Sequence, residues 1–101
     1  MTRNYNKLVR NRIPEIIEAS GQTYVTVVLS NEDYLQMLDE ELAEYRADQN
    51  IEELADLLEV SYAAVIARGC TSEQLEQVQA EKAEKRGRFT EKIRLLEVRD
   101  V

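Results

Sequence analysis

Residues that interrupt regular structure are rare in this sequence, which has only three glycines and one proline among its 101 residues. This scarcity argues against a turn-rich all-β fold and against a disordered linker, and it favours helices. A chain of this length forms one domain. We therefore expect a single domain over residues 1–101, with a core small enough that assembly with further copies would help to complete it.

Helix-start and helix-stop residues divide the chain into four helical segments. Pro14 suits the first turn of a short helix that Gly21 ends. The same signals predict three longer helices, over about 31–48, from the cap Asn50 to Gly69, and from Thr71 or Ser72 to Arg86. The β-branched run 23–29 predicts a minor strand, whereas residues 89–98 fit either a short strand or a helical tail. The expected fold is an all-α antiparallel helical bundle completed by oligomerisation.

The predicted helix over 50–69 is apolar on two sides. Its first stripe contains Ile51, Leu54, Leu58, Tyr62 and Val65, and its second contains Leu57, Val60 and Ala64 and runs back through Glu53. A helix of this kind is central, with one side packed within the chain and the other available to a partner chain.

The predicted helix over 31–48 has one apolar stripe, formed by Leu35, Leu38, Leu42 and Tyr45. Glu41 lies at the edge of this stripe, and Glu40 lies nearly opposite it. The sequence therefore predicts that Glu41, rather than Glu40, borders the buried face.

Residue types that the chain lacks exclude several classes of function. There is no histidine and only one cysteine, Cys70, so His-dependent catalytic triads and zinc-finger sites are excluded. Any metal site must use oxygen ligands, which suit Mg²⁺, Mn²⁺ or Ca²⁺. The net charge of −7 argues against nucleic-acid binding. Without an apolar run of ~20 residues or a signal-peptide core, we expect no membrane partner and a cytoplasmic location.

Charge follows the order basic, acidic, basic along the chain. Residues 1–14 carry four cations and no acid, residues 32–59 carry eleven acids and one cation, and residues 82–99 carry seven cations and three acids. Along one face of the last predicted helix, the residues are apolar near its start and become cationic at Lys82 and Arg86. This pattern fits ordinary surface ion pairing, and it also fits a site that needs carboxylates for a metal and cations for phosphate.

Two pairs of carboxylates lie at three-residue spacing on consecutive predicted helices. Glu41 pairs with Glu44, and Glu53 pairs with Asp56. A short connection makes these helices antiparallel neighbours, which brings the four carboxylates together. Because unpaired anions at close range repel one another, a divalent cation between them would remove an electrostatic cost.

These acids, in the pattern Glu-Glu-x-x-Glu followed by Glu-x-x-Asp, resemble the MazG-like all-α nucleoside triphosphate pyrophosphohydrolase superfamily. The opening Lys7-Leu8-Val9-Arg10-Asn11-Arg12-Ile13-Pro14, the stretch 52–60 and the segment Lys85-Arg86-Gly87-Arg88-Phe89 are similar to a small subfamily related to phosphoribosyl-ATP pyrophosphohydrolase. The resemblance covers nearly the whole chain in order. Asn11 and Arg88 stand where that subfamily usually has Asp and Gly.

The resemblance implies Mg²⁺-dependent hydrolysis of a nucleoside triphosphate between its α and β phosphates, as in the clearance of non-standard nucleotides, with Mn²⁺ as an alternative metal. It implies that Glu41, Glu44, Glu53 and Asp56 hold the metal. A further acid, Glu40 or Glu59, would accept a proton. Lys82 and Arg86, and also Lys7 and Arg10, would neutralise phosphates unless they only pair with the acidic helices. The expected assembly is a homodimer or homotetramer.

Two non-enzymatic hypotheses remain open from the sequence. One is an acidic helical module that binds a basic partner without catalysis. The other is a Ca²⁺-binding regulatory protein, although the chain has no EF-hand loop.

Overall fold

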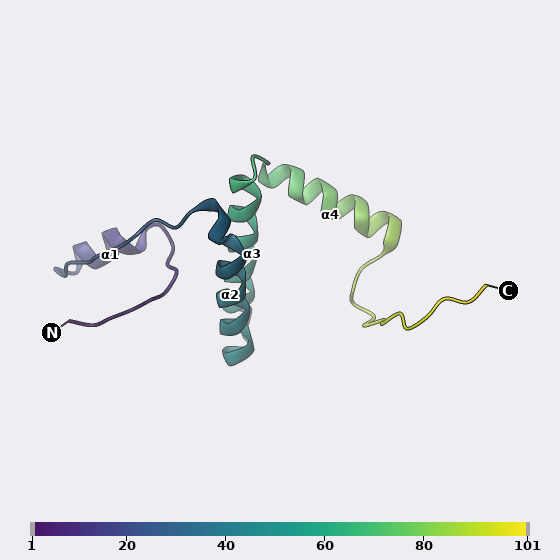
Figure 1. Ribbon diagram of the computed structural model, residues 1–101, viewed down its shortest axis with the longest axis horizontal. Coiled ribbons are helices and arrows are strands. Elements are labelled where there is room, and N and C mark those ends of the chain that lie inside the picture. Colours follow the sequence, from purple (N-terminus) through teal and green to yellow (C-terminus); the bar gives the residue numbers. More distant parts are fainter. Residues whose placement is uncertain (1, 101) are drawn as a thin grey trace.

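The computed structural model describes residues 2–100, which form four α-helices and one short 3₁₀ helix (Figure 1). Helix α1 spans Ile13–Ala19, and the 3₁₀ helix η1 spans Asn31–Asp33. The three longer helices are α2 (Tyr34–Asp48), α3 (Ile51–Ala67) and α4 (Ser72–Arg86). The all-α class predicted from the sequence is confirmed, and the helix ends lie close to the predicted residues.

Capping residues explain where the longer helices begin. The Asn50 side chain accepts a hydrogen bond from the Glu53 backbone N–H at 3.0 Å, which starts α3. Thr71 and Gln74 form a reciprocal capping box at the start of α4, with hydrogen bonds of 3.1 and 2.8 Å. Each cap satisfies backbone donors that have no partner inside the helix.

The connection between α2 and α3 is tight. Gln49 ends α2 in the left-handed region at φ 50°, and its N–H donates to the Tyr45 carbonyl at 2.7 Å. Asn50 follows at once as the cap of α3. With only these two residues between them, α2 and α3 turn back on one another as an antiparallel hairpin (Figure 1).

The hairpin contains the most buried side chains of the described chain. Met37 on α2 and Val60 on α3 are 7% and 9% exposed, and Glu41 is 8% exposed. The stripe of α3 that runs from Glu53 through Val60 therefore faces α2, as the sequence predicted for one side of this helix.

The predicted core stripe of α2 is wrong by about a quarter of a turn. Met37 and Glu41 lie at the centre of the packed face, whereas Leu35 and Leu42 are exposed. The predicted stripe left out Met37, the apolar residue of α2 that packs most deeply, and Glu41 lies one turn from Met37 on the same face. The exposed leucines are left on the outside of the hairpin.

The predicted strand over 23–29 is also wrong, because no strand forms between residues 2 and 100. Val25 and Val28 are both 99% exposed in an extended segment. β-branched residues favour a strand only when a neighbouring strand completes the ladder, and nothing in this part of the chain supplies one. The end of the chain, 87–100, contains turns but neither a helix nor a strand.

The molecule is elongated, with a radius of gyration of 18.5 Å and extents of 69 × 31 × 23 Å. Helices α1 and α4 project from opposite sides of the hairpin (Figure 1). A compact chain of ~100 residues has a radius of gyration of about 13 Å. Among the described residues, no helix has the length and apolar character needed to cross a membrane.

Candidate metal centre

Five carboxylates meet where α2 ends and α3 begins. Glu41, Glu44 and Asp48 share one face of α2, because they follow one another at helical spacing. Glu53 and Asp56 come from the first turns of α3. Carboxylate oxygens lie within 4.8 Å of one another in two overlapping groups, one of Glu41, Glu53 and Asp56 and the other of Glu44, Asp48 and Glu53. We call these five residues the carboxylate cluster.

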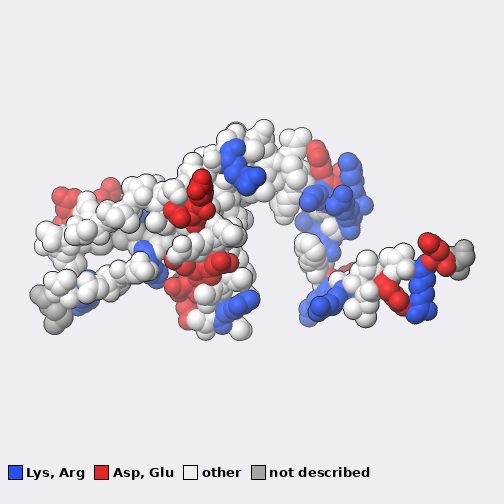
Figure 2. Space-filling model, in the orientation of Figure 1, with Lys and Arg blue, Asp and Glu red and all other residues white. Residues whose placement is uncertain are grey.

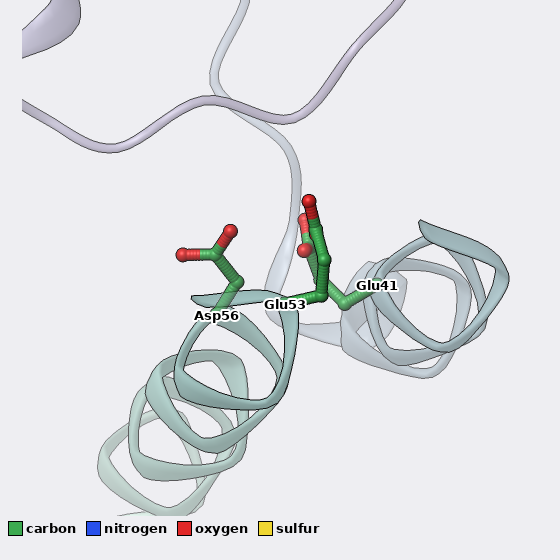
Figure 3. Close-up of side chains that lie close together, drawn as sticks. All are labelled: Glu41, Glu53 and Asp56. Atoms are coloured by element: carbon green, nitrogen blue, oxygen red, sulfur yellow. The ribbon is translucent and has the colours of Figure 1, made fainter. Parts of the chain in front are cut away.

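All four residues predicted as metal ligands belong to the carboxylate cluster, and Glu53 belongs to both groups. Figure 3 shows Glu41 reaching across from α2 to meet Glu53 and Asp56. Asp48 is the member that sequence reasoning missed. Its position four residues after Glu44 was the available signal, because residues so spaced lie on the same helix face.

Glu41 is the most deeply placed member of the carboxylate cluster. Its side chain lies at the α2–α3 interface and has no hydrogen-bond or ion-pair partner within residues 2–100. Burial raises the pKa of Glu41 above its ordinary value, and the charges of Asp56, Glu44 and Glu53 raise it further. The fold thus holds an acid where its charged form is disfavoured.

Glu53 occupies the middle of the carboxylate cluster. Partial burial is the main cause that raises its pKa, followed by the charges of Glu44, Asp48 and Asp56. A carboxyl surrounded by other carboxylates favours its neutral form unless a cation is added.

Two cations of the N-terminal segment pair with the carboxylate cluster. Lys7 Nζ lies 3.8 Å from Glu44 Oε1, and the Arg10 guanidinium donates to Asp56 Oδ1. The hydrogen bond and charge of Asp56 raise the pKa of Arg10, and the charges of Glu59 and Glu41 act in the same direction. Sequence reasoning left ion pairing and phosphate binding open for these two residues, and the structure shows the ion pairing.

The two predicted proton acceptors lie outside the carboxylate cluster. Glu59 follows Asp56 by one helical turn on α3 and borders an open cavity of about 370 Å³ with Tyr62 and Glu76. Tyr62 donates a hydrogen bond of 3.0 Å to Glu76 there, which raises the Tyr62 pKa. Glu40 is half-buried on α2 and belongs to neither carboxylate group.

Lys82 and Arg86 lie on α4 and are not brought to the carboxylate cluster of the same chain. Figure 2 shows acidic side chains gathered over the α2–α3 hairpin, and basic side chains at the far end of α4. Within the described residues, neither Lys82 nor Arg86 forms an ion pair.

The donor set of the carboxylate cluster fits a hard divalent cation. All of its donors are carboxylate oxygens, which Mg²⁺ and Ca²⁺ prefer. Two ligands of one Mg²⁺ lie at most about 4.2 Å apart, so oxygens within 4.8 Å of one another need only small side-chain rotations. Glu41 adds to this fit, because the residue is 8% exposed at the α2–α3 interface and forms no ion pair or hydrogen bond within residues 2–100, although its carboxyl oxygens still reach water.

Comparisons with known proteins give one partial match. A curated protein of Mycolicibacterium smegmatis, described as an uncharacterized protein, is 53% identical over 45 residues. The match covers 41% of this chain and 46% of the relative, so the chain spans less than half the length of that protein. No family model and no solved structure matches the chain.

Proposed function

We propose that this protein hydrolyses a nucleoside triphosphate at the α–β phosphate bond, in the manner of the MazG-like pyrophosphohydrolases, with Mg²⁺ held by Glu41, Glu44, Glu53 and Asp56. The products are a nucleoside monophosphate and pyrophosphate. One observation carries the proposal: carboxylates from two adjacent helices converge around Glu41, which is 8% exposed and has no hydrogen-bond or ion-pair partner among residues 2–100. Asp48 extends the same set on the side of Glu44.

The residues present suit phosphoryl transfer to water, a reaction that depends on charge neutralisation and positioning. When bound, Mg²⁺ supplies charge neutralisation for the phosphates and lowers the pKa of a water. Lys7 and Arg10 lie beside the carboxylate cluster, paired with Glu44 and Asp56, and would contact phosphate oxygens once those pairs open. We assign Glu59, rather than Glu40, as the acid that accepts a proton from the attacking water, because it follows Asp56 by one helical turn.

The proposed enzyme acts as a homodimer or homotetramer. One chain exposes 9872 Å², whereas a compact monomer of 11.7 kDa exposes roughly 5,900 Å². The difference of about 4,000 Å² exceeds the ~800 Å² that each partner buries in a standard interface. In an assembly, α4 of one copy can reach a carboxylate cluster of another, which would give Lys82 and Arg86 a role at phosphates. A reducing cytoplasm suits the free Cys70.

A panel of nucleoside triphosphates incubated with Mg²⁺ tests the proposal. We expect release of pyrophosphate, and loss of that release in Glu44→Gln and Asp56→Asn. Both variants should stay folded, because each removes a repelling charge and the ion pair that it also loses is exposed and contributes little stability. Glu52→Gln provides a matched control, since Glu52 is exposed on α3 outside the carboxylate cluster.

The other outcomes separate the competing functions. Release of orthophosphate would mean that a different bond is cut. Full activity in both variants would remove the carboxylates from catalysis. No hydrolysis of any triphosphate, together with binding of basic polypeptides, would favour a non-catalytic acidic module.

A further inference from the structure

The N-terminal segment 2–12 is an extended arm that lies beside the α2–α3 hairpin and reaches the carboxylate cluster through two side chains (Figure 1). In Figure 3 the carboxylates of Glu41 and Glu53 point toward the ribbon of the chain's purple N-terminal part. Contact is made through Lys7 with Glu44 and through Arg10 with Asp56. The arm therefore places two positive charges against the carboxylates proposed to hold the metal.

Little else attaches the arm to the hairpin. Among residues 2–12, only Leu8 is partly buried, and the arm has no regular structure before the turn that leads into α1. The first backbone hydrogen bond that involves it joins the Ile13 N–H to the Arg10 carbonyl at 3.0 Å. Its position over the carboxylate cluster thus depends mainly on the two ion pairs.

Both ion pairs are easy to break. The side chains of Lys7 and Arg10 are 59% and 58% exposed, so water screens their attraction to the carboxylates. A divalent cation interacts with the same carboxylates through twice the charge and at shorter range. Lys7 and Arg10 repel such a cation while they remain in place.

We infer that Lys7 and Arg10 are resident counter-ions that occupy the carboxylate cluster in the metal-free protein and are displaced when a divalent cation binds. This inference rests on the proposed metal site and adds an exchange to it. Metal binding releases the arm, and the two cations that it frees become available to the phosphates of an incoming nucleotide. Without metal, the positive charges of the arm therefore reduce the repulsion between the carboxylates. With metal bound, the same charges are free to bind the phosphates of the substrate.

Calorimetric titration with Mg²⁺ alone tests the exchange in the full-length protein. Arg10→Gln and Lys7→Gln should each tighten Mg²⁺ binding, by roughly two- to fivefold, which is the range expected for loss of one exposed charge pair. Arg12→Gln is the matched control. Arg12 lies on the same arm and carries the same charge, but it pairs with Glu15 of α1 at 2.8 Å. It should leave the affinity unchanged.

Limited proteolysis with trypsin gives a readout that does not depend on affinity or activity. Trypsin cuts after Lys7 and Arg10 themselves, so release of the arm should increase cleavage at both positions. We expect millimolar Mg²⁺ to raise these two cleavage rates severalfold relative to cleavage after Lys92, which serves as the internal reference in the C-terminal segment.

The possible results separate the exchange from the metal site. Mg²⁺ binding that is equally tight in the wild type and in all three variants would overturn the exchange and leave the metal site standing. Weaker binding in Arg10→Gln would also overturn it, since Arg10 would then support the metal. No Mg²⁺ binding by any form would overturn the exchange and the proposed function together.

Discussion

Glu41 is a buried acid with no protein partner in the part of the chain described. Packing against α3 removes part of the water around its side chain, and neighbouring acids add repulsion. Substitution by Gln keeps the shape and removes the charge. In the metal-free protein at neutral pH, we expect Glu41→Gln to raise the melting temperature by about 4–8 °C, the shift that ~1 kcal/mol produces in a small domain. Exposed Glu52→Gln serves as the control.

Melting temperatures measured over a pH series test the direction of the Glu41 pKa shift. Because the pKa of Glu41 is higher in the folded chain than its ordinary value of 4.5, the folded state binds more protons above that pH. The stability that this group contributes is therefore present at lower pH and is lost as pH rises through the window between the two pKa values. Glu53 acts in the same direction. Glu41→Gln should flatten this decline, and an unchanged slope would contradict the account.

Glu59 and Glu40 are the two candidates for the acid that accepts a proton from the attacking water. Neither acid belongs to a carboxylate group, but Glu59 lies one turn from Asp56 and its charge helps to raise the pKa of Arg10. We expect Glu59→Gln to lower pyrophosphate release by roughly 10²–10⁴-fold, as loss of a general base does. Glu40→Gln should lower it only slightly. A larger loss in Glu40→Gln would reverse the assignment.

The sequence correctly predicted which acids lie together where helical spacing alone determines their positions. The three-residue spacing of Glu41 with Glu44, and of Glu53 with Asp56, was enough to bring these acids together. It did not place Glu41 at the centre of the packed face, because that depends on which side of α3 meets α2. Asp48 was overlooked although it obeys the same spacing rule.

At the scale of elements, the turn between α2 and α3 sets the geometry of the carboxylate cluster. Asn50 caps α3 through the backbone N–H of Glu53, whose side chain belongs to both carboxylate groups. We expect Asn50→Ala to lower stability by about 1 kcal/mol and to weaken Mg²⁺ binding as well. Titration calorimetry and thermal melting measure the two effects.

Thr71→Ala is the matched control for this prediction. Thr71 caps α4 in the same way, through the Gln74 N–H, but it lies at the start of a helix that carries none of the carboxylate cluster. It should lower stability by a similar amount without changing Mg²⁺ affinity. Equal effects on affinity in both variants would mean that the cap does not position Glu53.

Sequence signals predicted the helices better than the strand for a physical reason. Caps such as Asn50 and Thr71, and the stop at Gly87, act on backbone groups within a few residues. A strand over 23–29 depends on a partner segment elsewhere in space, which local propensity cannot supply.

At the scale of the whole molecule, the exposed apolar surface is the main feature. Leu54 and Leu58 line one side of α3, and Leu35 lies exposed on α2. Sequence analysis left open which side of α3 would meet a partner chain, and the exposure of Leu54 and Leu58 makes their side the candidate. The two-sided pattern of α3 was readable from sequence, but the elongated shape was not, because it depends on where α1 and α4 project.

Sedimentation velocity tests the assembly. We expect a particle whose mass is a multiple of 11.7 kDa, and we expect Leu58→Asp to shift it toward the single chain because a charge would then lie in the apolar contact. Gln22→Glu adds the same charge in an exposed loop and should leave the mass unchanged. A wild-type protein that sediments as a compact monomer would contradict the proposed assembly.

Glu53 offers the most direct measurement of the central claim, that the carboxylates of α2 and α3 together hold a divalent cation. It is the only residue shared by the two carboxylate groups found among residues 2–100. Titration calorimetry with Mn²⁺ should show saturable binding to the wild-type protein, and Glu53→Gln should abolish it while the helical content is retained. Equal Mn²⁺ binding by the wild type and Glu53→Gln, or no binding by either, would contradict the account.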